Sequence, residues 1–357
     1  MPVTQHFQYL DGWRGLAIAS LLVGHFFPVP GINLGTFGVN LFFVLSGLLM
    51  SRLLFEKSVP LDEFYRRRIA RIFPAALAFI ALLVFGYLIA GRKVDWLDVA
   101  AAATFTNNYF EGTTGPWRMP LGHLWSLSVE EHSYIILSLV AVAARRKLAD
   151  PKILVISATA VIALFGIHYQ LFSDPANMAR LSLHTEVAGF GIFASAALFL
   201  CMRHRDKPAL SGWVFIGLLA VSIATHWWFV PAPVRIIVGV GALAIAVNFL
   251  ASAPAWIHAV LSIAPLRQLG LWSFSLYIWQ QPFYMYYRYY GMDRLVGFGL
   301  ALACGIASFY LIEQPSRRFL NERWGRKPGA VPQALQPGVA SNTDRVEITT
   351  SRSRHTV

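Results

Sequence analysis

An arginine and a histidine stand eleven positions apart in the first apolar stretch of the chain. At 3.6 residues per turn and 1.5 Å rise per residue, eleven positions make almost three turns, so Arg14 and His25 share one helix face about 16 Å apart. Ile18 and Leu21 complete the stripe between them. A neutral imidazole can act as general base or nucleophile near neutral pH. The spacing predicts a functional face; the alternative is a histidine bonded to a neighbouring carbonyl for packing.

A basic segment, residues 64–74, follows the second apolar stretch and reads Phe-Tyr-Arg-Arg-Arg-Ile-Ala-Arg-Ile-Phe-Pro. Arg68 and Arg71 are three apart and therefore lie on one helix face. Guanidinium groups in that arrangement suit phosphate, which they bind through paired hydrogen bonds. The alternative is that the segment is basic because cytoplasmic loops are basic.

Carboxylates occur inside a later apolar run, where ionisable residues are expensive and mark functional sites. Glu130 and Glu131 lie about two turns beyond His123. Adjacent residues on a helix point about 100° apart, so one of the two is expected to face the bundle centre. A desolvated carboxyl can hold or shuttle a proton, or orient an imidazolium. The alternative is a structural ion pair with an arginine or a helix end, and Glu186 is a weaker case of the same kind.

The composition predicts that these residues sit in a membrane. Of 357 residues, 56% are hydrophobic and 13% are charged, with a net charge of +12; a soluble protein has about 25% charged residues. Apolar runs such as 153–167 and 238–251 exclude a soluble nucleic-acid binder and a disordered chain. Two cysteines, without metal-ligand spacing, exclude a disulfide-stapled secreted domain. The expected class is an all-α integral membrane protein.

Ten apolar runs are long enough to span a bilayer, which takes roughly 20 residues. Residues 95–110 are apolar but short, and are read as an interfacial or re-entrant helix. The expected spans are 13–29, 37–54, 72–90, 123–143, 153–172, 182–201, 211–229, 234–252, 268–290 and 294–313.

The distribution of basic residues orients this arrangement. With ten spans and a cytoplasmic N-terminus, 23 of the 30 Lys and Arg fall on the cytoplasmic side and 7 on the other. The sequence therefore predicts that both ends are cytoplasmic, with a membrane domain over 1–320. Residues 321–357 are polar and lack apolar periodicity, which predicts a disordered cytoplasmic tail.

Five local patterns occur in an order that is similar to the membrane acyltransferase 3 family of bacterial O-acyltransferases. They are Arg-x10-His from Arg14 to His25, Gly-Val-Asn-Leu-Phe-Phe-Val-Leu-Ser-Gly at 38–47, Arg-x-x-Arg within 66–74, Leu-Trp-Ser-Leu-Ser-Val-Glu-Glu within 123–134, and the last-helix motifs at 273–279 and 310–315. The resemblance runs from about residue 5 to 320.

The resemblance implies a ten-helix domain that moves an acyl group, usually acetyl, from cytoplasmic acyl-CoA to a hydroxyl of a saccharide or lipid-linked glycan. It implies His25 as the catalytic histidine and Glu130 as part of the essential segment. It implies Arg68 and Arg71, with Arg14, as ligands of the CoA phosphates. Further candidates for supporting roles are Asp11, Ser46, His123, Glu131 and Glu186.

The resemblance also implies the setting of the reaction. We expect a multi-pass protein of the bacterial inner membrane, with acyl-CoA (acetyl-CoA above all) as co-substrate and a saccharide or glycolipid as acceptor. Neither a bound cofactor, a metal nor a nucleic-acid partner is expected, and the oligomeric state is left open. Gln280 stands where many members carry histidine. The C-terminal esterase-like domain that some members have is not expected here.

The sequence leaves two other classes of protein function open. A proton-coupled transporter would use His25 and Glu130 as an intramembrane relay, but the sequence shows no paired repeats of Gly/Pro-broken helices. A structural assembly factor for an envelope complex would carry out no acyl transfer.

Overall fold

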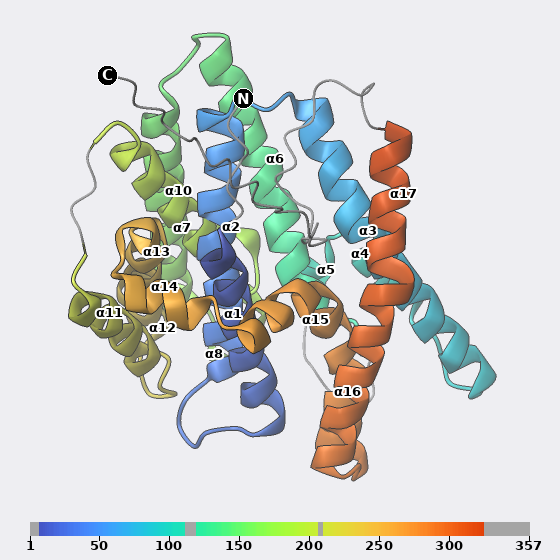
Figure 1. Ribbon diagram of the computed structural model, residues 1–357. Coiled ribbons are helices and arrows are strands. Elements are labelled where there is room, and N and C mark those ends of the chain that lie inside the picture. The colour runs from blue at the N-terminus through green and yellow to red at the C-terminus, as the bar shows by residue number, and fades with distance from the viewer. Residues whose placement is uncertain (1–6, 111–118, 206–209, 325–357) are drawn as a thin grey trace, which may run out of the picture. The chain divides into compact units, whose positions relative to one another are not determined.

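The computed structural model describes residues 7–110, 119–205 and 210–324, and within them the chain is helical without a β-strand (Figure 1). An antiparallel bridge between Ile32 and Trp227 joins two of the connections between helices. Gln8–Gly325 form one structural unit, and every element below belongs to it. The predicted all-α class is confirmed.

The N-terminal third forms long helices that begin at recognisable caps. The Asn33 side chain accepts a hydrogen bond from the Thr36 N–H at 2.9 Å, which satisfies an otherwise orphaned donor at the start of the second helix. Pro60 precedes the third, as expected where the chain turns back. The elements are α1 (Gln8–Phe26), α2 (Leu34–Ser51), the π-helical η1 (Arg52–Glu56) and α3 (Leu61–Ile89).

The middle third alternates short and long helices. Asp95 and Asp150 cap α4 and α7, each accepting from backbone N–H groups of the first turn. The predicted short helix over 95–110 is present as two pieces, α4 and α5. The elements are α4 (Trp96–Ala103), α5 (Asn107–Phe110), the 3₁₀ turn η2 (Gly122–Leu124), α6 (Trp125–Arg145), α7 (Pro151–Phe172), α8 (Pro175–Leu181), α9 (Thr185–Ala188) and α10 (Phe190–Met202).

The last third ends in one long run of α16, η5 and α17, orange to red in Figure 1. This run passes residue 320, where the predicted membrane domain ends; residues 325–357 of the predicted tail lie outside the described residues. The elements are α11 (Gly212–Thr225), α12 (Ala232–Val234), η3 (Arg235–Val240), α13 (Gly241–Asn248), η4 (Leu250–Ser252), α14 (Ala255–Leu261), α15 (Ala264–Tyr290), α16 (Arg294–Ser308), η5 (Phe309–Glu313) and α17 (Gln314–Trp324).

Five helical runs of the described chain are long and apolar enough to cross a membrane by length and composition. Many of their apolar side chains face outward, which suits lipid contact and would be costly in water. The protein is accordingly a multi-pass membrane protein. The five runs are Leu34–Glu56, Leu61–Ile89, Gly122–Arg145, Pro151–Phe172 and Arg294–Trp324.

Helices α1 and α15 pack with their backbones in close contact, and glycines make this possible. A Cβ added at Gly270 would lie 1.9 Å from the Asp11 carbonyl oxygen, and one at Gly15 would lie 1.9 Å from the Leu266 carbonyl oxygen. Such distances leave no room for a side chain. Small residues of this kind let membrane helices approach closely and gain packing that lipid cannot offer.

Replacing Gly270 should therefore separate the two helices. We expect Gly270→Val to destabilise the protein by at least about 3 kcal/mol, because overpacking of this severity exceeds the usual 1–3 kcal/mol range. The measurement is the midpoint of thermal unfolding of the purified protein in detergent. Gly217→Ala is the control, because nothing lies within 4 Å of an added Cβ there. Equal midpoints for both variants would contradict the close approach.

Candidate active site

A cavity of about 110 Å³ lies among α1, α2, α3, α6 and α15. That is room for several water molecules or a small polar group. Five of the residues predicted from the sequence line it, contributed by four different helices: Arg14, Ser46, Arg68, Arg71 and Glu130. The structure thus brings together side chains that are more than a hundred residues apart in the chain.

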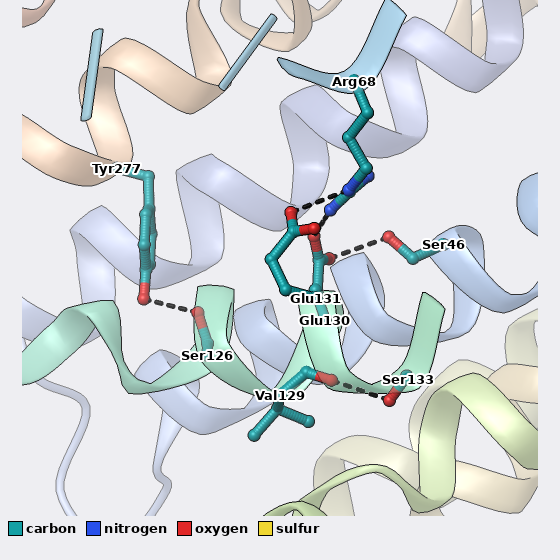
Figure 2. Close-up of polar contacts among 8 residues, drawn as sticks. All are labelled: Ser46, Arg68, Ser126, Val129, Glu130, Glu131, Ser133 and Tyr277. Atoms are coloured by element: carbon teal, nitrogen blue, oxygen red, sulfur yellow. Dashed lines mark hydrogen bonds and ion pairs between the residues drawn. The ribbon is translucent and has the colours of Figure 1, made fainter. Parts of the chain in front are cut away.

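Arg68 is the centre of the polar contacts beside this cavity (Figure 2). Its Nε donates to Glu131 Oε1 at 2.7 Å and its Nη2 donates to Glu130 Oε2 at 3.3 Å. The guanidinium also lies over the Tyr134 ring, 3.5 Å from the centroid. Ser46 Oγ donates to Glu130 Oε1 at 2.8 Å. Three residues of α6 therefore hold the guanidinium of Arg68 in a fixed orientation, and Ser46 of α2 holds one of the two carboxylates.

The pairing explains how these charges are tolerated. The side chains of Arg68, Glu130 and Glu131 are only 11%, 15% and 13% exposed, and buried charges persist where they are paired. One carboxylate was expected to face the bundle centre. Both reach Arg68, although Glu130 lines the cavity and Glu131 does not.

The three arginines that line the cavity differ in whether an acidic side chain already pairs with them. Arg68 is engaged by two carboxylates, and Arg14 donates to Asp11 at 3.1 Å. Within the described residues, Arg71 makes neither a hydrogen bond nor an ion pair, although it lines the cavity. Arg71 is therefore the cation best placed to receive an anion there.

His25 lies near the C-terminal end of α1 and is not among the residues that line the cavity. Its Nδ1 is 2.7 Å from Gln280 Oε1. Its ring stacks on Tyr284, with centroids 4.3 Å apart and planes 17° apart. No hydrogen bond joins it to Glu130, which the sequence had suggested as the group that orients the imidazole. The neighbour that orients the ring is Gln280.

Two further predicted residues lie in other surroundings. His123 Nε2 donates to the Ile278 carbonyl at 3.1 Å and is buried. Glu186 accepts from the Tyr109 and Tyr169 hydroxyls at 2.9 and 3.1 Å, and its carboxylate lies 3.2 Å from His184 Nδ1. Glu186 thus belongs to a separate polar cluster that shares no residue with the Arg68 cluster.

The sequence did not indicate the aromatic partners of Arg68 and His25. Tyr134 follows Glu130 by four residues, and Tyr284 follows Gln280 by four, so each pair shares a helix face. Tyr277 lines the cavity and hydrogen-bonds Ser126 Oγ at 2.6 Å. An i, i+4 search around the acidic and amide residues would have found Tyr134 and Tyr284; nothing local indicates Tyr277.

The family model of an acyltransferase domain, acyltransferase 3, matches residues 7–313. The protein belongs to the acyltransferase 3 family. This match covers every candidate residue of the two clusters and His25. No solved structure shows a significant match to the chain.

Three curated relatives of this acyltransferase 3 protein come from bacteria. YrhL of Bacillus subtilis (strain 168) is 27% identical, covering 78% of this chain and 49% of that protein. The peptidoglycan O-acetyltransferase OatA of Listeria monocytogenes is 25% identical over 76% of this chain and 48% of its own. The O-acetyltransferase OatA of Staphylococcus aureus is 25% identical over 79% and 51%. The chain spans about half the length of each of these relatives.

Removing the Arg68 guanidinium should leave two neighbouring carboxylates without their counter-charge. We expect Arg68→Gln to lower the free energy of unfolding of this acyltransferase 3 protein by about 3 kcal/mol, as breaking a buried pair does. The measurement is thermal unfolding in detergent. Arg66→Gln, on the same helix, is the matched control, because Arg66 and its partner Asp62 are 52% and 57% exposed. If Arg68→Gln lowers the stability no more than Arg66→Gln does, the pairing of Arg68 with the two carboxylates does not stabilise the fold.

Proposed function

We propose that this protein is a membrane O-acyltransferase that moves an acyl group, acetyl above all, from cytoplasmic acyl-CoA to a hydroxyl of a saccharide or lipid-linked glycan. The observation that carries the proposal is the environment of His25. This residue is a histidine within an apolar bundle, oriented by Gln280 and Tyr284, and it leaves Nε2 without a hydrogen bond in the described part of the chain. The family match and the names of the relatives favour the same chemistry.

The donor end of the site is the cavity. Arg71 and Arg14 supply positive charge on one wall, and phosphate binds well to guanidinium groups. Apolar residues such as Phe42 and Leu49 also line the cavity, which suits the uncharged arm that carries the thioester. Arg68, held by its carboxylates, would then shape this wall more than it binds the donor.

One helix face connects the donor cavity with His25. On α15, Ser273 and Tyr277 line the cavity, and Gln280 and Tyr284 contact His25 one and two turns further on. On α1, Arg14 likewise lines the cavity, and His25 lies about three turns further along the same helix face. The acyl group would follow this face from the arginines to the imidazole.

The acceptor would approach from the far end of α15, which is rich in tyrosine. Arg92 lies 5.6 and 5.4 Å from the ring centroids of Tyr286 and Tyr290, and Arg294 lies 5.6 Å from that of Tyr287. Aromatic faces pack against the apolar faces of sugar rings, and exposed arginines attract anionic groups. This end therefore supports a saccharide acceptor, of the kind that the relatives' names indicate.

The proposed setting is the bacterial inner membrane, crossed ten times with both ends in the cytoplasm. Helices cover most of each of the ten apolar runs, and the unequal distribution of basic residues supports the orientation. Arg14 and Arg71 would then open toward cytoplasmic acyl-CoA, and the tyrosine-rich end toward the outer face.

Loss of the imidazole should stop the reaction without preventing membrane insertion. We expect His25→Ala to lower acetyl transfer at least about 100-fold, because general base catalysis contributes 10²–10⁴-fold. The measurement is label from radioactive acetyl-CoA in envelope glycans, with membrane abundance followed by immunoblot. His168→Asn, an exposed histidine on α7, is the control. Wild-type activity in His25→Ala would refute the assignment, and absence of transfer by the wild type would refute the function.

The arginine wall should recognise the phosphates of the donor. We expect Arg71→Gln to raise KM for acetyl-CoA about tenfold, as loss of a charge-assisted hydrogen bond of about 1.5 kcal/mol would. The same variant should discriminate less between acetyl-CoA and its 3′-dephospho form. Arg67→Gln is the control, since Arg67 pairs with Glu63 and is not part of the cavity wall. An unchanged KM in Arg71→Gln would place the phosphates elsewhere.

A further inference from the structure

The two ring nitrogens of His25 have different surroundings. Nδ1 lies 2.7 Å from Gln280 Oε1, while Nε2 has no hydrogen-bond partner among the residues that the structure describes. A Cβ added at Gly35 would lie 3.2 Å from Nε2 and 3.3 Å from Cδ2. Glycine at position 35 therefore leaves the space beside Nε2 clear.

The orientation of the Gln280 amide follows from a second hydrogen bond. Gln280 Nε2 donates to Gln281 Oε1 at 3.2 Å. An amide has one donor end and one acceptor end, so its oxygen faces His25 once its nitrogen is engaged. Both glutamines are buried, with 0% and 5% of their surfaces exposed. Water cannot easily replace either contact, and in an apolar interior each hydrogen bond is correspondingly strong.

An acceptor opposite Nδ1 decides where the imidazole proton resides. The carbonyl oxygen of Gln280 can only accept, so Nδ1 carries the hydrogen and Nε2 carries the lone pair. The Tyr284 stack, at 4.3 Å, fixes the plane of the same ring. Together the two contacts hold one tautomer in one orientation.

We propose that Gln280, itself oriented by Gln281, is a positioning residue that fixes the Nδ1–H tautomer of His25 and thereby makes Nε2 the atom that takes the acceptor's proton. This proposal rests on the proposed function. Neither glutamine was assigned a role from the sequence, where Gln280 was noted only as a departure from the histidine common in the family.

In the proposed reaction, His25 carries a proton from the acceptor to the leaving group. The acceptor hydroxyl gives its proton to Nε2 while its oxygen forms a bond to the thioester carbonyl carbon. The carbon–sulfur bond of acyl-CoA breaks, and the departing CoA sulfur takes the proton from Nε2. His25 is returned to its Nδ1–H form, and Gln280 keeps its hydrogen bond throughout. The ester and free CoA are the products.

The test compares two substitutions at position 280. Gln280→Leu keeps the volume but removes the acceptor, and we expect kcat to fall about 100-fold, with KM for acetyl-CoA unchanged. Gln280→Glu restores an acceptor, and we expect it to recover at least a tenth of the wild-type rate. Its half-maximal rate on the acidic side should move to higher pH, because a carboxylate beside Nδ1 favours the imidazolium.

The controls separate positioning from stability and from the reaction itself. Gln268→Leu, three turns earlier on α15, should leave kcat and KM unchanged. Gln281→Met should lower kcat about tenfold, because Gln280 loses the contact that orients its amide. Thermal unfolding in detergent is measured for every variant.

The outcomes are distinct. A full rate in Gln280→Leu, while His25→Ala is inactive, overturns the positioning role and leaves the proposed function standing. No rescue and no change of pH profile in Gln280→Glu overturns it as well. If Gln280→Leu does not fold, the pH profile of Gln280→Glu decides alone. Absence of transfer by the wild type removes the proposed function, and this inference with it.

Discussion

The close contact between α1 and α15 is the constraint on which the candidate site depends. Gly15 and Gly270 let the two backbones meet, with added Cβ atoms only 1.9 Å from the opposing carbonyl oxygens. Because the helices touch, Gln280 and Tyr284 on one reach His25 on the other. Were the axes separated by even a methyl group, a hydrogen bond of 2.7 Å at His25 would be lost.

A second constraint is the cost of charge in an apolar bundle. Arg68 meets this cost with Glu130, Glu131 and the ring of Tyr134, and Ser46 completes the coordination of Glu130. The cluster joins α2, α3 and α6 beside the cavity. Apolar residues of similar volume would suit a membrane interior better, so the presence of this charged cluster indicates a requirement for fixed charge at this place.

The sequence predicted the helical class and the membrane character, because both follow from hydropathy that is summed over long segments. It also predicted five residues that line one cavity, through motifs on four separate helices. It offered an arginine as an alternative partner of the two glutamates, and the structure shows that pairing, but it identified neither Arg68 as that arginine nor Gln280 as the partner of His25. Arg68 was interpreted as a phosphate ligand, yet two carboxylates hold it; Glu130 was interpreted as the partner of His25, yet Gln280 holds that ring. Partner choice depends on how helices rotate against one another, and residue spacing within one helix carries no information on that.

The stripe of α1 from Arg14 to His25 has a consequence for substrate size. A helix rises 1.5 Å per residue and scarcely stretches, so these two side chains are held at a fixed separation along one rod. Under the proposed reaction, the distance between Arg14 and His25 along α1 sets the length that a donor must have. A thioester whose anionic head is anchored at the arginines reaches the imidazole only when its linker matches that span. In donors with a truncated arm, the anionic head would bind but the thioester would not reach the imidazole of His25. The length of the donor, and not only its charge, would therefore decide which thioesters react.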